Sequence, residues 1–132
     1  MKFTGEASGL PEIEQQAILA MAAEIGVPAA FLAAIRIAEN GGPGREFGVL
    51  SESAGTYEQQ CRIAALSIRN NQYRYVLRFK EWPVDGHGGL SEAFTKFMAA
   101  RWAPVGVEND PTSLNQHWPR NVWRAYQASG VG

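Results

Sequence analysis

Apolar residues recur every three to four positions along most of the chain, which is the spacing of one face of an α-helix. Segments rich in glycine, proline and asparagine interrupt this pattern and separate one helix from the next. The pattern predicts helices over residues 11–25, 29–39, 56–69, 73–79 and 91–102, and a short last helix beginning near Pro119. The chain is therefore predicted to be mainly α-helical.

Two of these boundaries carry specific signals. Thr56 with Gln59 three positions later has the pattern of a capping box, in which each side chain bonds the backbone N–H of the other residue. Asn70-Asn71 is expected to break the helix that begins there. Residues 40–44, which include three glycines and a proline, are expected to end the second helix.

The segment 45–52 has neither a clear helical nor a clear strand pattern, and we interpret it as a short turn or β-hairpin. The length of 132 residues and the mass of 14.4 kDa suit one domain. The predicted fold is thus mainly α, a single compact domain over residues 1–132 with one short β-hairpin near residues 45–52.

Composition excludes several functional classes. Twelve Lys and Arg residues against thirteen Asp and Glu give a net charge of -1, which argues against a nucleic-acid partner. The single cysteine, Cys61, excludes an intramolecular disulfide and is expected to be a small core residue. His87 and His117 have no second ligand at helical or hairpin spacing, so no metal site is predicted. Since a phosphate loop precedes a helix whereas residues 41–44 follow one, no cofactor is predicted either.

Membrane and export signals are also missing from the sequence. No apolar stretch approaches the roughly 20 residues that a membrane span needs, so no integral membrane segment is expected. The first residues lack the apolar core of a Sec signal peptide. We therefore expect synthesis in the cytoplasm without a Sec signal.

Glu39 is the residue at which the pattern indicates chemistry. Leu32 and Ile35 lie seven and four positions earlier, so Glu39 projects from an apolar helix face. It also lies in the last turn of the predicted helix, where unpaired carbonyl groups disfavour a negative charge. Both effects should raise the pKa of its carboxyl, and a protonated carboxyl can act as a general acid. The alternative is that Glu39 extends into solvent or pairs with Arg36 or Arg45.

The segment 33–42, followed by Gly48-Val49-Leu50-Ser51, resembles the lysozyme-like superfamily, in particular lytic transglycosylases and goose-type lysozymes. In that family an apolar helix ends in a catalytic Glu, and a short loop leads to a glycine-aliphatic segment that lines the cleft. Glu39-Asn40-Gly41 matches the first element, whereas Ser51 stands where the family has Gln. The resemblance is strongest over residues 11–70.

This resemblance implies a lysozyme-like helical domain whose partner is the glycan strand of peptidoglycan. The implied reaction is cleavage of the β-1,4 bond between N-acetylmuramic acid and N-acetylglucosamine, with Glu39 protonating the glycosidic oxygen. The implied substrate-binding residues are Gly48, Val49, Leu50 and Ser51. In the family a tyrosine from a later helix commonly orients the Glu or the sugar; Tyr73, Tyr75 and Tyr126 qualify.

A second catalytic carboxylate would distinguish a hydrolase from a transglycosylase. Glu46 and Glu52 are the candidates, because both follow Glu39 in the same loop region. Glu52 is the catalytic candidate we retain, since it directly follows the segment implied to line the cleft. A transglycosylase would use the 6-hydroxyl of the substrate instead of water and would tolerate its replacement.

Two readings from other classes remain as alternatives. One is a non-catalytic helical protein, either a phage structural or adaptor component or a wall-binding module. The other, a helical DNA-binding regulator, is disfavoured by the net charge and by the glycines that end the helix at Glu39. For the enzyme, the missing Sec signal fits a phage or prophage product that reaches the wall with a virion or through a membrane lesion.

Overall fold

The computed structural model describes residues 1–51, 53–84, 89–103, 105 and 114–132. Five α-helices lie within these residues, with a two-stranded antiparallel sheet and two short 3-10 helices. In chain order the elements are β1 (Phe3–Gly5), η1 (Glu6–Gly9), α1 (Glu12–Ile25), α2 (Ala29–Glu39), α3 (Tyr57–Phe79), α4 (Glu92–Trp102), η2 (Leu114–His117), α5 (Trp118–Gln127) and β2 (Ser129–Val131). The mainly α class predicted from the sequence is confirmed.

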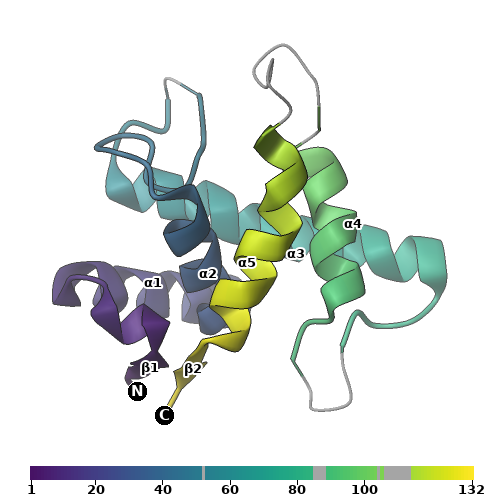
Figure 1. The fold of residues 1–132 in the computed structure, drawn as a ribbon, viewed down its shortest axis with the longest axis horizontal. Helices are drawn as coiled ribbons and strands as arrows, with labels where there is room; N and C mark the ends of the chain where they lie inside the picture. Colours follow the sequence, from purple (N-terminus) through teal and green to yellow (C-terminus); the bar gives the residue numbers. More distant parts are fainter. Residues whose placement is uncertain (52, 85–88, 104, 106–113) are drawn as a thin grey trace.

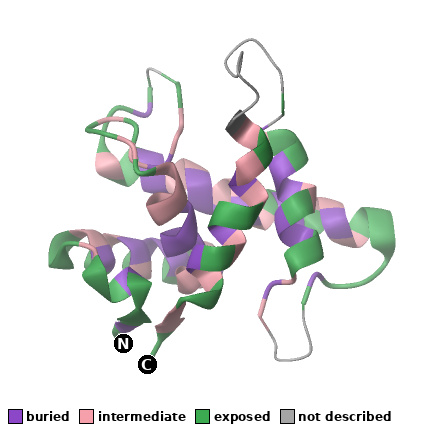
Figure 2. Cartoon of the chain, in the orientation of Figure 1, coloured by how far each residue is buried: buried purple, intermediate pink, exposed green. Residues whose placement is uncertain are grey.

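Helix α2 forms the centre of the hydrophobic core. Residues 31–35 are all fully buried, and α2 packs against α1, α3 and α5. Ala33 and Ala34 lack bulky side chains, which lets neighbouring backbones approach from more than one side. Figure 2 shows the buried residues gathered along α2 and on the faces of its neighbours that turn toward it. The residue that ends this helix is therefore anchored to the most buried element.

The chain ends pair with each other as the small sheet. Strands β1 and β2 are antiparallel, with Phe3 opposite Val131 and Gly5 opposite Ser129, so the termini lie side by side (Figure 1). Gly5 has a φ of 69°, and a Cβ there would lie 2.0 Å from the carbonyl oxygen of Ala128. Only glycine fits this close approach.

The β-hairpin expected near residues 45–52 is not formed by residues 45–51, which make turns instead. The backbone N–H of Arg45 bonds the carbonyl of Gly42, and that of Gly48 bonds the carbonyl of Arg45, each at 2.9 Å. Gly44 and Gly48 both have positive φ, which bends the chain out of the extended conformation that a strand needs.

Helix α3 is continuous, so the break expected at Asn70-Asn71 is wrong. Asn71 is buried, and its side-chain amide donates to the carbonyl oxygen of Ser67 at 2.8 Å while its own oxygen accepts from Arg74. Because these polar groups are satisfied within the helix, Asn71 does not compete with the helical backbone. The capping box predicted at Thr56 is confirmed by reciprocal 3.1 Å bonds with Gln59.

No helix within the described ranges is long and apolar enough to cross a lipid bilayer.

Candidate active site

Glu39 is the last residue of α2, and the chain turns immediately after it. Asn40 adopts a left-handed conformation with φ of 45°, which ends the helix and directs the loop back over the Glu39 side chain. Leu32 and Ile35, two turns and one turn before Glu39, are fully buried. Glu39 itself is half-buried. The helix thus places a carboxyl at the edge of the core, as its spacing from the apolar residues predicted.

Two tryptophans donate hydrogen bonds to this carboxyl. The indole Nε1 of Trp118 lies 2.6 Å from Oε1 of Glu39, and the indole of Trp102 also hydrogen-bonds the carboxyl group. Trp102 ends α4 and Trp118 begins α5, so the site joins three helices that are distant in sequence. An indole N–H can only donate, which fixes the carboxyl as the acceptor.

Burial raises the pKa of the Glu39 carboxyl above its ordinary value of 4.5. The cause is loss of hydration, which destabilises the charged form more than the neutral form. The bonds from Trp118 and Trp102 act in the opposite direction, because they favour the carboxylate, but their effect is smaller. The direction agrees with the expectation from the sequence.

Neither arginine that could have neutralised Glu39 is paired with it. The Nε of Arg36 forms an ion pair with Oε1 of Glu14 at 2.8 Å, and the guanidinium of Arg45 donates to the carbonyl oxygen of Gly44. Glu39 takes part in none of the ion pairs among the described residues. The alternative of a surface salt bridge at Glu39 therefore has no support in this geometry.

The backbone of Gly48 lies close to the other carboxyl oxygen. A Cβ at position 48 would lie 2.1 Å from Oε2 of Glu39 and 2.5 Å from its Cδ, far inside van der Waals contact. Gly48 also has a φ of 77°, a conformation that residues with side chains rarely adopt. The glycine predicted to line the cleft is thus brought directly against the catalytic candidate.

Gln60 on α3 holds this loop in place. Its side-chain oxygen accepts from the backbone N–H groups of Phe47 and Val49, both at 3.2 Å. Its amide nitrogen donates to the carbonyl oxygens of Gly44, Val49 and Ala54 at 2.7–2.8 Å. The side chain is fully buried. The Gln60 side chain therefore hydrogen-bonds the backbone on both sides of Gly48. These backbone groups are consequently not available to pair with a β-strand.

Sequence reasoning missed Gln60 and the donor role of Trp118. Gln60, Ala64 and Ile68 share one buried face of α3, so Gln60 is a polar residue at an apolar position. Buried polar groups almost always have hydrogen-bond partners. A glutamine on the apolar face of a helix was therefore the signal that could have indicated a hydrogen-bonding role for Gln60. No comparable signal exists for Trp118, which is 79 residues from Glu39.

The other residues of the segment expected to line a cleft differ in their contacts. Val49 is held by Gln60, Leu50 is 58% exposed, and the hydroxyl of Ser51 bonds that of Ser53 at 2.8 Å. Glu46 accepts a hydrogen bond from the backbone N–H of Gly44, so its carboxyl stabilises a turn. Glu52, the other predicted catalytic residue, lies outside the described residues.

The three candidate tyrosines occupy different places. The Tyr126 hydroxyl accepts from the backbone N–H of Leu90 at 3.0 Å, and its ring packs on Phe31. Tyr75 is buried among aromatic side chains that include Phe97. Tyr73 is 56% exposed, on the far half of α3. The aromatic residues shown to bond Glu39 are tryptophans.

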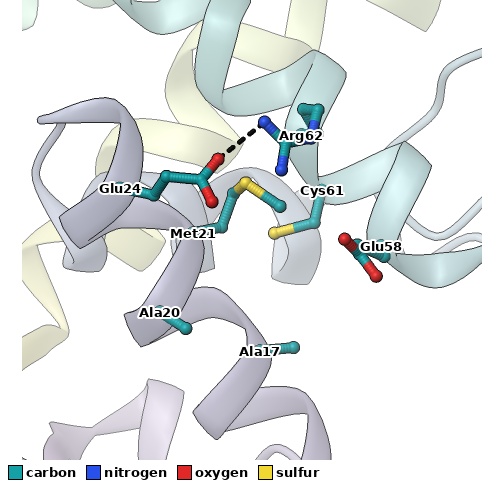
Figure 3. Close-up of a pocket in the computed structure, with 7 residues that line it drawn as sticks. All are labelled: Ala17, Ala20, Met21, Glu24, Glu58, Cys61 and Arg62. Atoms are coloured by element: carbon teal, nitrogen blue, oxygen red, sulfur yellow. Dashed lines mark ion pairs between the residues drawn. The ribbon is translucent and has the colours of Figure 1, made fainter.

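A separate pocket of about 270 Å³ lies between α1 and α3 (Figure 3). Cys61 and Met21 line its floor, and an ion pair of 2.6 Å between Arg62 and Glu24 borders it. Burial raises the pKa of the Cys61 thiol to about 12, so the thiol is neutral and unreactive at physiological pH. Cys61 is the core residue that the sequence indicated, and this pocket shares no lining residue with the Glu39 site.

Comparison with family models, with curated proteins and with solved structures finds no match to this chain. Among the residues that the structure describes, no group of three or more His, Cys, Asp or Glu side chains is placed to hold a metal ion. The geometry around Glu39 is therefore the feature of this protein that indicates a function.

Replacing Gly48 with Ala tests the contact with the carboxyl. We expect Gly48→Ala to displace the Glu39 side chain toward water, which lowers the pKa of Glu39, and to cost about 1–3 kcal/mol of stability from backbone strain. Carbon-detected NMR titration of the Glu39 carboxyl and thermal unfolding measure both effects. Gly42→Ala is the matched control, because a Cβ at Gly42 meets nothing within 4 Å. Equal behaviour of the two variants would contradict the proposed contact.

Replacing Gln60 with Leu tests the loop anchor. Gln60→Leu keeps the approximate volume but leaves five backbone groups without their bonds, so we expect a loss of about 3 kcal/mol or more in the free energy of unfolding. Amide hydrogen exchange should rise at Phe47 and Val49, whose N–H groups Gln60 accepts. Gln16→Ala, at an exposed glutamine of α1, is the control and should change neither quantity. Unchanged exchange at both amides would remove Gln60 from this role.

Proposed function

We propose that this protein cleaves the glycan strands of peptidoglycan at the β-1,4 bond between N-acetylmuramic acid and N-acetylglucosamine, with Glu39 as the general acid. The observation that carries the proposal is a half-buried carboxyl with a raised pKa, held by indole donors and free of ion pairs among the described residues. A raised pKa favours the protonated form of the carboxyl, which is the form that a general acid needs. The resemblance of residues 11–70 to lysozyme-like enzymes supports the substrate class.

The proposed reaction begins when Glu39 donates its proton to the glycosidic oxygen. The bond from C1 of the muramoyl residue to that oxygen breaks, and the glucosamine leaves with a hydroxyl group. The Glu39 carboxylate then takes the proton of the muramoyl 6-hydroxyl, whose oxygen bonds C1 to close an anhydro ring. No water is consumed, and Glu39 ends the cycle protonated.

The two oxygens of the Glu39 carboxyl are suited to different roles, one to accepting a hydrogen bond throughout the reaction and the other to carrying the transferred proton. Oε1 accepts the Trp118 bond in either protonation state, as a carbonyl oxygen or as part of a carboxylate. The Trp118 and Trp102 donors stabilise the negative charge that Glu39 carries between the two proton transfers. This leaves Oε2, beside Gly48, to carry the proton.

We favour a lytic transglycosylase over a hydrolase. A hydrolase usually needs a second carboxylate to activate water or to form a covalent intermediate, whereas the anhydro route needs only one. Glu46 is engaged in bonding Gly44. The exposed side chains of Leu50 and Ser51 are available to contact the glycan beside Glu39.

Replacing Glu39 with Gln should abolish wall cleavage, because the amide keeps the shape and still accepts from Trp118 but has no acidic proton. We expect a loss of about 10²–10⁴ in rate without loss of folding. The assay is digestion of purified peptidoglycan with mass analysis of the released muropeptides, where anhydro ends from the wild type identify a transglycosylase.

Glu52→Gln is the matched control in the same assay, and we expect it to retain most activity. A loss as large as that of Glu39→Gln, together with reducing-end products from the wild type, would identify a two-carboxylate lysozyme instead. No release by the wild type would favour the non-catalytic alternative, a structural or wall-binding protein.

The raised pKa of Glu39 also predicts two pH dependences. Activity should fall as pH rises through this pKa, because the acid loses its proton. The folded state binds this proton more tightly than the unfolded state, in which the pKa of Glu39 is near 4.5. The stability of the wild type relative to Glu39→Gln should therefore decrease as pH rises from about 4.5 to the folded-state pKa, then stay constant. Urea unfolding of both proteins across this range measures the difference; a difference that grows with pH would contradict burial of the carboxyl.

A further inference from the structure

The far half of α3 exposes apolar side chains that the proposed catalytic site does not use. Of the ten large hydrophobic residues exposed in the described chain, five fall within residues 73–84. The largest exposures there are 71% for Leu77 and 56% for Tyr73, which lie four positions apart and therefore share one helix face. Trp82, 49% exposed, packs its ring on Tyr73 at 6.5 Å. Figure 2 shows this end of α3 exposed where it extends past α4.

Positive charge surrounds these side chains. Arg74, Leu77 and Arg78 line one open hollow with Phe97 of α4, and Arg101 of α4 is close enough to lower the pKa of Arg74, after the larger effect of burial. We call Tyr73, Leu77 and Trp82 with Arg74, Arg78 and Arg101 the basic-aromatic face. None of its arginines takes part in the ion pairs formed among the described residues.

The charge of this region is opposite to that of the whole chain. Residues 69–82 contain four basic residues and one acidic residue, Glu81, whereas the chain as a whole carries a net charge of -1. The guanidinium groups of Arg74 and Arg78 also lie over the rings of Phe97 and Phe79, at 5.1 and 5.6 Å from the ring centroids. The cations are thus held beside the apolar groups rather than dispersed.

We propose that the basic-aromatic face binds the surface of a bilayer that contains anionic phospholipids. Tryptophan, tyrosine and leucine side chains enter the boundary between headgroups and acyl chains, while arginines pair with the lipid phosphates. A soluble polyanion would use the arginines but leave Leu77 in water, and a second copy of this chain would bring like charges together. The bilayer is the partner that engages both the apolar and the basic side chains.

The test is co-sedimentation of the intact chain with vesicles of phosphatidylcholine alone and with about 30% phosphatidylglycerol. We expect binding to the anionic vesicles only, and release at about 0.5 M salt, where charges are screened. Arg78→Gln with Arg101→Gln removes two exposed cations and should weaken partitioning about 30-fold. Tyr73→Ser with Leu77→Ser should also weaken it, because the apolar contact is lost.

Two control variants carry the same kinds of substitution, a cation to Gln and an exposed apolar residue to Ser, at positions outside this face. Lys2→Gln with Arg120→Gln removes two exposed cations that are not among the residues of this face, and Ile13→Ser changes a residue of α1 that is 81% exposed. Both should bind as the wild type does, and circular dichroism checks that every variant is folded. Equal loss in the controls, binding to neutral vesicles, or capture by heparin without capture by vesicles would overturn the proposal. Sedimentation showing a dimer that Leu77→Ser disrupts would assign the face to a second copy instead.

Discussion

The contact between the Gly48 backbone and the Glu39 carboxyl is the constraint on which the site depends. It requires a loop that turns back on the end of α2, a residue without a side chain at position 48, and an anchor that prevents the loop from moving away. Gln60 is that anchor, and it binds backbone groups on both sides of Gly48. Because Gln60 is fully buried in α3, the position of the loop is set by the packing of the core. The geometry of the carboxyl is therefore a property of the whole fold.

The environment of Glu39 balances two opposed effects on its charge. An indole donor favours the carboxylate, as hydrogen bonds to charged groups contribute about 1.5–3 kcal/mol. Burial disfavours it, and in this site burial is the larger effect. A fully exposed carboxyl would be ionised near neutral pH, whereas a buried one without donors would strongly resist ionisation during a reaction. The combination allows the group to hold a proton and also to release it, which is the requirement for a residue that acts first as acid and then as base.

The sequence predicted those parts of the site that depend on local spacing. The end of α2, the position of Glu39 beside Leu32 and Ile35, and the capping box at Thr56 all depend on residues within a few turns of one another. The strands β1 and β2 have three residues each and pair across the length of the chain, so their sequences carry no usable pattern. Trp118 reaches Glu39 only through the packing of α5 on α2, which no local pattern encodes.

The continuity of α3 has a consequence for both proposals. The break expected at Asn70-Asn71 would have separated Gln60 from Tyr73 and Leu77 and allowed the two ends to move independently. Asn71 instead satisfies its polar groups within the helix, and α3 runs unbroken from Tyr57 to Phe79 (Figure 1). Gln60 and Leu77 are thus joined by 17 helical residue steps, a distance of about 25 Å along the axis. A bilayer bound to the basic-aromatic face would therefore hold the loop anchor, and with it Glu39, at a fixed distance and orientation from the lipid surface.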